Sequence, residues 1–328
     1  MSGQGEFALI ARHFAPLTKG VPLAFGLTDD AAMLKPRKGQ ALVVTADAIV
    51  EGVHYLPDDP PETIARKLLR VNLSDLAAKG ATPRAYLLTA AFPRDVKEPW
   101  IAAFARGLKQ DQAHFGVHLL GGDTVATPGP ATFSLTAIGE VPGARMLRRS
   151  GARPGDLVCV SGTIGDGGFG LAELRQPHPD LTDAQRRFLI ARYRIPQPRT
   201  RLGPSLLGLA SAALDVSDGL IQDLGHIARQ SGVGLSIDAA AVPLSPAGLA
   251  IARGDPPARL RALSAGDDYE IAFTVPKARL KAMEAAAAKA RIRVSVIGRV
   301  MKGQGVTVLG PDGTPFEAGP GGFDHFGR

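Results

Sequence analysis

Strand-like and helix-like segments alternate along this chain in two runs, and this alternation restricts the fold more than any single motif does. Expected helices show apolar residues every three or four positions, whereas expected strands are short apolar runs. In the first run we expect strands near 41–47, 85–92 and 132–141, and helices near 6–17, 59–80 and 98–115. Such an alternation predicts an α/β fold.

The second run follows a segment rich in glycine, arginine and proline, 143–155, which indicates a domain boundary. Its expected strands lie near 157–161, 212–216, 233–237, 269–275 and 292–300. Its expected helices lie near 165–175, 183–192, 199–211, 218–231 and 277–290. Because 328 residues suit two domains better than one, we predict domains at 1–145 and 146–328.

The composition is that of a folded, cytoplasmic protein. Hydrophobic residues make up 45% of the chain and charged residues 21%, which favours packed cores over disorder. No apolar run reaches the roughly 18 residues of a membrane span, and no signal peptide is visible. The single cysteine, Cys159, excludes an internal disulfide, and its apolar neighbours predict a core thiol rather than a nucleophile.

The net charge of +7 leaves two interpretations open. A basic chain can bind nucleic acid, but here the basic residues are scattered and aromatic residues, which would stack on bases, are only 5%. Small anionic substrates fit the same charge. We therefore expect no nucleic-acid partner and no membrane partner.

One glycine-rich segment matches a dinucleotide-binding motif only in part. Gly165, Gly167 and Gly170 satisfy G-x-G-x-x-G, but a Rossmann site also needs an acid about 20 residues later. The sequence there is a proline-broken loop, 176–180. The glycines therefore either let a helix start pack closely or let backbone N–H groups approach a phosphate. The sequence also lacks a Walker phosphate loop.

Aspartates recur where expected strands end or glycine loops begin. They are Asp29, Asp30, Asp47, Asp75, Asp123, Asp215, Asp218, Asp267 and Asp268. A single aspartate of this kind is usually a turn residue or a helix cap, but so many in one chain favour a shared role. Clustered carboxylates repel one another, so they need cations in order to converge.

These residue types suit magnesium. Carboxylate oxygens select Mg²⁺, Mn²⁺ or Ca²⁺ over zinc, and no His/Cys spacing supports a zinc site. Mg²⁺ typically takes one or two carboxylates, with water and phosphate oxygens in its other positions. Since an acid-lined site would bind a polyphosphate only through bridging metals, we predict phosphoryl chemistry with Mg²⁺. Gly121 and Gly122 would let the backbone approach a phosphate.

Taken in order, these segments resemble the thiamine-monophosphate kinase family, of the aminoimidazole ribonucleotide synthetase superfamily. The matching segments span nearly the whole chain and are GEFALIARHF, DDAAML, TADAIVEGVHY, VNLSDLAAKGA, HLLGGDT, RSGARPGD, VSGTIGD, DVSDGLIQDLGHIA, GDDYEIAFTVP and FDHFG. The resemblance implies α/β domains with mixed sheets. The N-terminal domain would bind ATP and Mg²⁺ and form a homodimer through its sheet, and the C-terminal domain would close the active site. We expect the dimer to bury Leu87, Leu88 and Phe133.

The resemblance also implies the roles of individual residues. Several Mg²⁺ ions would be held by Asp30, Thr45, Asp47, Asp75, Asp123, Asp215 and Asp218. ATP would be contacted by Gly122, Asp123, Arg149 and Ser217. Thiamine monophosphate would be contacted by His54, Asp267 and Phe323. No residue is expected to act as a nucleophile.

Three positions depart from the family pattern. Ala46 stands where a hydroxyl is usual, so one metal contact would be missing or come from the backbone. Asp267 replaces a glutamate and is one methylene shorter, and Phe323 replaces a tyrosine, keeping a face for cation–π stacking on the thiazolium but losing the hydroxyl.

Structural alternatives remain for three of these residues. His54 could be a surface histidine, Arg149 a charge of the linker, and Phe323 an anchor for the C-terminal tail.

Direct in-line transfer of the γ-phosphoryl of ATP to thiamine monophosphate is the function that these features predict. The acceptor phosphate is already ionised, so the chain would supply positioning and charge neutralisation. Two alternatives are another ATP-dependent member of the superfamily, such as aminoimidazole ribonucleotide synthetase, and a nucleotide-binding module without turnover.

Overall fold

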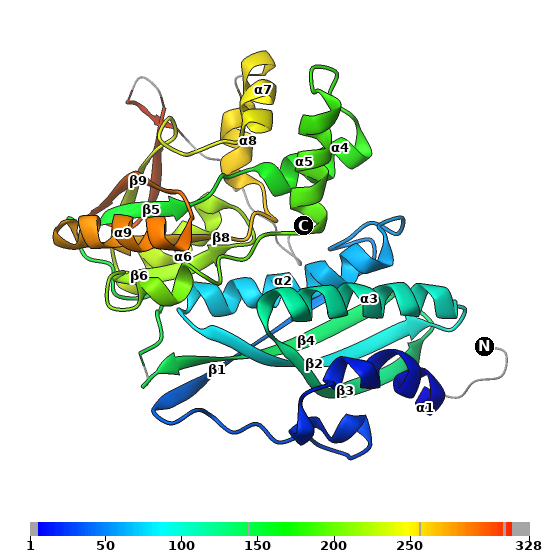
Figure 1. Cartoon of the computed structure of the whole chain (residues 1–328). Helices are drawn as coiled ribbons and strands as arrows, with labels where there is room; N and C mark the ends of the chain where they lie inside the picture. The colour runs from blue at the N-terminus through cyan, green and yellow to red at the C-terminus, as the bar shows by residue number, and fades with distance from the viewer. Residues whose placement is uncertain (1–5, 144, 256, 311–312, 317–328) are drawn as a thin grey trace. The chain divides into compact units, whose positions relative to one another are not determined.

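The computed structural model describes residues 6–143, 145–255, 257–310 and 313–316. The chain forms two compact units, each with its own sheet (Figure 1). The first unit comprises Met1–Leu76 and Ala81–Ala144, and the second comprises Ala77–Gly80 and Arg145–Arg328. Within the described part of the chain, no helix is both long and apolar enough to cross a membrane.

The first unit is a four-stranded sheet in the order β1-β4-β2-β3, with two long helices on one face (Figure 1). Its strands are β1 (Gln40–Val50), β2 (Thr82–Pro93), β3 (His118–Thr127) and β4 (Thr132–Pro142). Its long helices are α2 (Pro61–Ala78) and α3 (Glu98–Phe115). β4 pairs antiparallel with β1 and β2, whereas β2 and β3 are parallel, so the sheet is mixed.

The two faces of this sheet differ because successive strand residues point in opposite directions. On β1, Val43 and Ile49 point into the core beneath α2 and α3, whereas Val44 on the other face is 60% exposed. The core contains a cluster of aromatic rings from β2, α3 and β4, which are Phe92, Trp100, Phe104 and Phe133. The face turned away from the helices keeps apolar side chains exposed, namely Leu42, Val44, Leu87 and Val125.

The segment before β1 is helical, but it is not the single helix expected at 6–17. It consists of α1 (Glu6–Leu9), a π-helical turn (Ile10–Phe14) and two 3₁₀ turns (Ala15–Thr18 and Pro22–Leu27). Pro16 has no N–H to continue the ladder of an α-helix, which accounts for the change to a 3₁₀ turn there.

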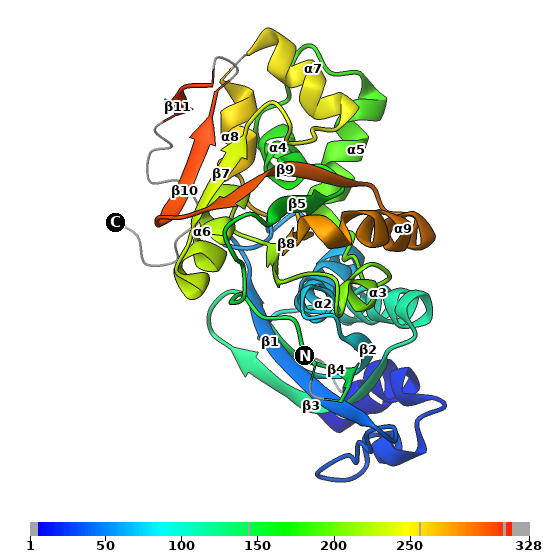
Figure 2. The ribbon, with the colours of Figure 1, turned by 90° about the vertical axis from the view of Figure 1, so that its left-hand side faces the viewer.

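The second unit is built on a mixed seven-stranded sheet in the order β11-β10-β7-β9-β5-β8-β6, with β11 at one edge (Figure 2). Its strands are β5 (Leu157–Ser161), β6 (Ala212–Val216), β7 (Gly234–Asp238), β8 (Glu270–Val275), β9 (Val294–Met301), β10 (Gly305–Leu309) and β11 (Pro315–Phe316). Its α-helices are α4 (Asp166–Arg175), α5 (Asp183–Arg194), α6 (Leu220–Ser231), α7 (Pro246–Gly254), α8 (Ala258–Ser264) and α9 (Leu280–Ala290).

Strand alternation divides the interior of the second unit between two cores. Val158 and Val160 on β5 join the core that includes α4 to α8, whereas Cys159 between them joins the core that includes α9. Cys159 is fully buried. Burial first, and then the charge of Glu284, raises the pKa of the Cys159 thiol to about 12, so it is not a nucleophile at neutral pH. The expected core thiol is confirmed.

The α/β fold class with mixed sheets is confirmed, but several element assignments were wrong or incomplete. The helix expected at 199–211 is only a 3₁₀ turn, Gly203–Leu206, because Pro204 and the flanking glycines do not support a longer helix. β1 continues three residues beyond Asp47, so this acid lies inside a strand. Elements that we did not expect are β3, β10, β11, α7 and α8.

Two of the three residues that we expected at a dimer interface are instead buried inside the first unit. Leu88 and Phe133 are buried in the core of the first unit, beneath its helices, because they alternate with the residues of the open face. Leu87 does lie on the open face, where it is 38% exposed.

Candidate active site

In the first unit, β1 and α2 hold one group of the expected metal ligands. The Thr45 hydroxyl donates to Asp75 Oδ2 at 2.5 Å, and the Asp47 N–H donates to Asn72 Oδ1 at 3.0 Å. Asn72 and Asp75 are three residues apart on α2, so both meet β1 from one helix face. The Asn72 side-chain amide donates to Leu68 O at 2.9 Å, which fixes the orientation of the Asn72 oxygen toward Asp47.

A second group of expected ligands lines a cavity of about 560 Å³ within the first unit. Asp29 and Asp30 enter from the segment before β1, and Gly122 and Asp123 from β3. Asp29 Oδ1 accepts the Asp30 N–H at 2.8 Å, and Asp123 Oδ1 accepts the Thr124 N–H at 2.9 Å. These three aspartates are exposed, and the cavity that they line also has threonines and apolar side chains in its walls.

Gly122 is required where β3 approaches β2. A Cβ atom at this position would lie 1.7 Å from Leu88 O, so no other residue fits without moving a strand. The structure therefore shows a role for this glycine in the close packing of two parallel strands; its expected approach to a phosphate stays a prediction. The same close approach places Asp123 opposite Thr89 of β2, and both line the cavity.

His54 is fixed in a tight turn after β1. The Val50 N–H donates to His54 Nδ1 at 3.1 Å, and the buried Lys67 ammonium donates to His54 O at 2.9 Å. Because Nδ1 accepts a hydrogen bond, the neutral ring carries its proton on Nε2. The half-buried ring is therefore held in a defined orientation, which a loose surface histidine would not be.

In the second unit, the end of β6 carries Asp215, and the loop after it carries Ser217 and Asp218 around a buried carboxylate. Asp215 is 8% exposed at the penultimate position of the strand. Asp223 Oδ2, in the first turn of α6, accepts the N–H groups of Ser217, Asp218 and Gly219 at 3.1, 3.1 and 3.2 Å. Burial first, and then the charge of Asp218, raises the pKa of Asp223 to about 7.

Asp267 lies next to this loop. The Asp267 N–H donates to Ser217 O at 2.8 Å, and the Tyr269 N–H donates to Val216 O at 2.7 Å. One residue expected to contact ATP and one expected to contact the acceptor are therefore joined by a backbone hydrogen bond.

The glycines of the partial dinucleotide motif have a packing role. At the start of α4 the Gly165 and Gly167 N–H groups donate to the buried carboxylate of Asp268, at 2.6 and 3.1 Å. A Cβ at Gly170 would lie 2.1 Å from Leu189 O on α5. Of the two interpretations left open, close packing is confirmed; an aspartate of the chain itself occupies the place proposed for a phosphate.

Arg149 is exposed and its backbone is held by α6. The Ser231 hydroxyl donates to Arg149 O at 3.4 Å and accepts the Gly151 and Ala152 N–H groups at 3.1 and 3.2 Å. Burial, followed by the charges of Arg149 and Arg229, lowers the pKa of His226 on α6. Arg149 thus belongs to a small basic cluster at the second unit's surface.

Phe323 lies outside the described residues.

The expected metal ligands do not form a single cluster within either unit. Five of them belong to the first unit, namely Asp30, Thr45, Asp47, Asp75 and Asp123, and Asp215 and Asp218 belong to the second. Over the described residues, no three His, Cys, Asp or Glu side chains lie close enough to hold one metal ion. Their role as metal ligands therefore stays a prediction.

The donor chemistry nevertheless fits a hard cation. Two fully buried acids of the chain, Asp111 and Glu270, are neutralised by Arg70 and Arg199. Among the described residues, no Lys or Arg forms a salt bridge with Asp30, Asp75 or Asp123, although the chain has 38 basic residues. Carboxylates left without a basic partner, together with a hydroxyl, are the oxygen ligands that Mg²⁺ prefers.

Comparison with known proteins identifies the family. The model of the AIR synthase related protein, N-terminal domain, matches residues 28–141, and that of the C-terminal domain matches residues 153–310. Thiamine-monophosphate kinase from Caulobacter vibrioides is 45% identical over 96% of this chain and 90% of that protein. The chain belongs to the thiamine-monophosphate kinase family.

Solved structures agree with this family assignment. Thiamine-monophosphate kinase from Stenotrophomonas maltophilia is 40% identical, with a TM-score of 0.84 over 95% of this chain and 98% of that one. A structure of AaThiL complexed with AMPPCP and TMP is 32% identical, with a TM-score of 0.78 over 98% and 97% of the two chains. We conclude that the chain is an enzyme of this kinase family.

The sequence analysis missed the role of the buried acids whose hydrogen bonds hold the loops of the candidate site in place. Asp223 and Glu270 were not considered, and Asp268, one of the recurring aspartates, was given no role of its own, because the partners of Asp268 and Glu270 lie in distant elements. Asp223 was the one with a local signal, an acid in the first turn of a helix that follows glycine, where backbone N–H groups need an acceptor.

The geometry around Asp223 predicts different outcomes for two substitutions. All three backbone bonds go to one oxygen, so the carbonyl oxygen of Asp223→Asn can accept them, whereas Asp223→Ala leaves them unpaired. We expect Asp223→Ala to lower the free energy of unfolding of the second unit by about 1–3 kcal/mol and Asp223→Asn by less than about 1 kcal/mol. Urea unfolding followed by far-ultraviolet circular dichroism measures both; equal losses would contradict this account.

Proposed function

We propose that this chain transfers the γ-phosphoryl group of ATP to thiamine monophosphate and so makes thiamine diphosphate. The observation that carries the proposal is the near-full-length likeness to the solved structure that holds AMPPCP, an analogue of ATP, together with TMP. The curated relatives named thiamine-monophosphate kinase support the same substrates; one from Salmonella typhimurium is 41% identical over 98% of both chains.

We assign ATP and its metals to the residues that the family resemblance implies. Asp30, Thr45, Asp47, Asp75, Asp123, Asp215 and Asp218 would hold Mg²⁺. Bound there, Mg²⁺ would neutralise phosphate charge and orient the two phosphate groups. Gly122 would let backbone amides approach a phosphate, and the exposed Arg149 guanidinium would bind ATP with the help of Ser217.

We assign the acceptor to His54, Asp267 and Phe323. The Nε2–H of His54 is a suitable donor to a phosphate oxygen, because Nδ1 is already engaged by Val50. A carboxylate repels phosphate, so Asp267 would contact the amine or the cationic ring of thiamine monophosphate rather than its phosphate.

Direct transfer needs no further group from the chain. The acceptor phosphate is ionised at neutral pH, so a strong general base is unnecessary, and the raised pKa of Cys159 removes that thiol as a covalent intermediate. What remains for the chain is to bind both substrates together, to neutralise charge and to exclude water, as in other phosphoryl transfers.

Transfer of a radiolabel tests the reaction and its mechanism together. With γ-labelled ATP, Mg²⁺ and thiamine monophosphate, the label should appear in thiamine diphosphate and not on the protein. The same incubation without acceptor is the control. Absence of labelled thiamine diphosphate would overturn the proposed function, whereas a stoichiometric phosphoenzyme that passes its label to the acceptor would overturn direct transfer.

Replacing an expected metal ligand should remove turnover without unfolding the protein. We expect Asp123→Asn to lower kcat about 100-fold or more, because a ligand of the phosphate-bridging metal is lost. Its melting temperature without Mg²⁺ should not fall, since Asp123 is exposed and the change removes repulsion between acids.

The matched control is Asp95→Asn, an exposed aspartate of the first unit outside the cavity, which should keep wild-type activity. Both variants are assayed across a range of Mg²⁺ concentrations. Near-normal turnover of Asp123→Asn at low Mg²⁺ would contradict the assignment.

We also propose that the open face of the first unit's sheet forms the homodimer. Leu42 and Val44 expose apolar area there, which a second copy would bury. Sedimentation at micromolar concentration should give a dimer, and Val44→Asp should give a monomer. The control is Val296→Asp, which changes a valine that is also exposed, 41% against 60% for Val44, on β9 of the second unit; a monomeric wild type would contradict the proposal.

A further inference from the structure

In the loop 266–269, the residues directly before and after Asp268 have φ angles outside the regions that are common for non-glycine residues. Asp267 has a φ of +69° and Tyr269 a φ of +53°. Non-glycine residues hold such left-handed values only where their surroundings impose them, often at functional sites. The contacts of the intervening residue, Asp268, therefore decide the conformation in which Asp267 is presented.

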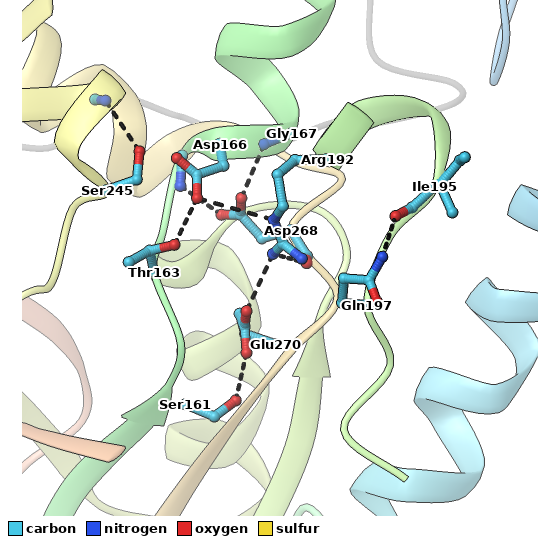
Figure 3. A network of polar contacts seen from close by, with 12 residues as sticks. Ser161, Thr163, Asp166, Gly167, Arg192, Ile195, Gln197, Ser245, Asp268 and Glu270 are labelled. Carbon is cyan, nitrogen blue, oxygen red and sulfur yellow. Dashed lines mark hydrogen bonds and ion pairs between the residues drawn. The ribbon is translucent and has the colours of Figure 1, made fainter. Parts of the chain in front are cut away.

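Both the side-chain carboxylate and the backbone carbonyl of Asp268 accept hydrogen bonds (Figure 3). Its carboxylate spans the start of α4, where Oδ2 accepts the Gly165 N–H at 2.6 Å and Oδ1 accepts the Gly167 N–H at 3.1 Å. Its backbone carbonyl accepts Arg192 Nη2 from α5 at 3.1 Å. The side chain is fully buried, so water does not compete for these bonds.

Arg192 is itself anchored to the first residue of β8. The guanidinium donates to Glu270 Oε1 at 3.0 Å, and Glu270 Oε2 accepts the Ser161 hydroxyl at 2.6 Å (Figure 3). Glu270 Oε2 also accepts Arg199 Nε at 2.6 Å. The support behind Asp268 therefore includes α5 and two strands, all within the second unit. The buried Glu270 carboxylate is paired with both Arg192 and Arg199, which makes this network resistant to displacement.

The start of α4 also packs directly against the peptide of Asp267. A Cβ atom at Gly167 would lie 2.3 Å from Asp267 O. Any shift of the Asp268 carboxylate relative to Gly165 and Gly167 would therefore move Asp267, whose N–H is bonded to Ser217 O on the other side.

We propose that Asp268 is a positioning residue for the acceptor substrate, which it affects through Asp267. The inference rests on the proposed function, in which Asp267 contacts thiamine monophosphate. A short aspartate in the place of a longer glutamate has less reach, so its contact depends more strongly on where the loop places its backbone.

Asp268→Asn tests the proposal with almost no change in volume. The carboxylate accepts with both oxygens, whereas an asparagine has one acceptor and turns its NH₂ toward the second N–H, so one hydrogen bond is lost. We expect the KM for thiamine monophosphate to rise about tenfold or more, with kcat and the KM for ATP within about threefold of wild type.

A double-mutant cycle separates positioning through Asp267 from a general structural effect. Asp267→Ala should raise the same KM, and Asp267→Ala combined with Asp268→Asn should raise it no further. Gly167→Ala, which pushes on the Asp267 peptide from α4, should reproduce the selective effect and serves if Asp268→Asn does not fold. An unchanged KM in Asp268→Asn, or independent effects that multiply in the double variant, would overturn the proposal.

A matched control and a structural readout complete the test. Thr182→Ala removes the side-chain cap of α5 and costs stability in the same unit, but it leaves loop 266–269 alone; its KM values should stay at wild type. Hydrogen exchange should speed up in Asp268→Asn within 163–170 and 264–271 and not in α9.

These readouts distinguish the two proposals. A wild-type enzyme that binds but does not phosphorylate thiamine monophosphate would contradict the proposed function alone. Hydrogen exchange would then decide the positioning role, and unchanged exchange in both segments would overturn it.

Discussion

Two buried aspartate carboxylates of the second unit accept backbone N–H groups where a loop leads into a helix. Asp223, in the first turn of α6, accepts three from the residues just before that helix, and Asp268 accepts two at the start of α4. An unpaired buried N–H is costly, so these carboxylates determine how the loops next to them can fold. The loops that carry Ser217 and Asp267 therefore depend on these two carboxylates. The hydrogen bond from the Asp267 N–H to Ser217 O joins the two loops, which lie far apart in the sequence, into one surface.

Much of the fold could be predicted from the sequence because local patterns were strong. The periodic apolar residues of α2, α3 and α6, and the short apolar runs of β5, β6 and β8, each indicated the element that formed. β3 was missed because two glycines and an aspartate in its middle are typical of a loop. There a tertiary requirement, the close approach of β3 to β2, outweighed the local preference. The segment 199–211 shows the opposite case, because its leucines suggested a helix that Pro204 prevents.

Residues of the candidate site could be predicted only where the local sequence singles them out. Asp47, Asp75 and Asp123 could be singled out because each follows apolar or glycine residues. Their contacts could not, because the partner of Thr45 is 30 residues away and the partners of Asp268 about 100 residues away. The tautomer of His54 likewise depends on the turn that follows β1. The residues proposed to contact a substrate could be singled out by pattern, whereas the contacts that hold them in place depend on the tertiary fold.

The position of the single cysteine has a practical consequence for work on this enzyme. Cys159 is enclosed between two strands and two cores, and its sulfur is protonated at physiological pH. Maleimides and mild oxidants act on exposed thiolates, so they should leave the folded native chain unmodified. A cysteine introduced at the surface of either unit could therefore carry a fluorophore or spin label in an otherwise wild-type background, and a pair of them would report the distance between the two units during turnover.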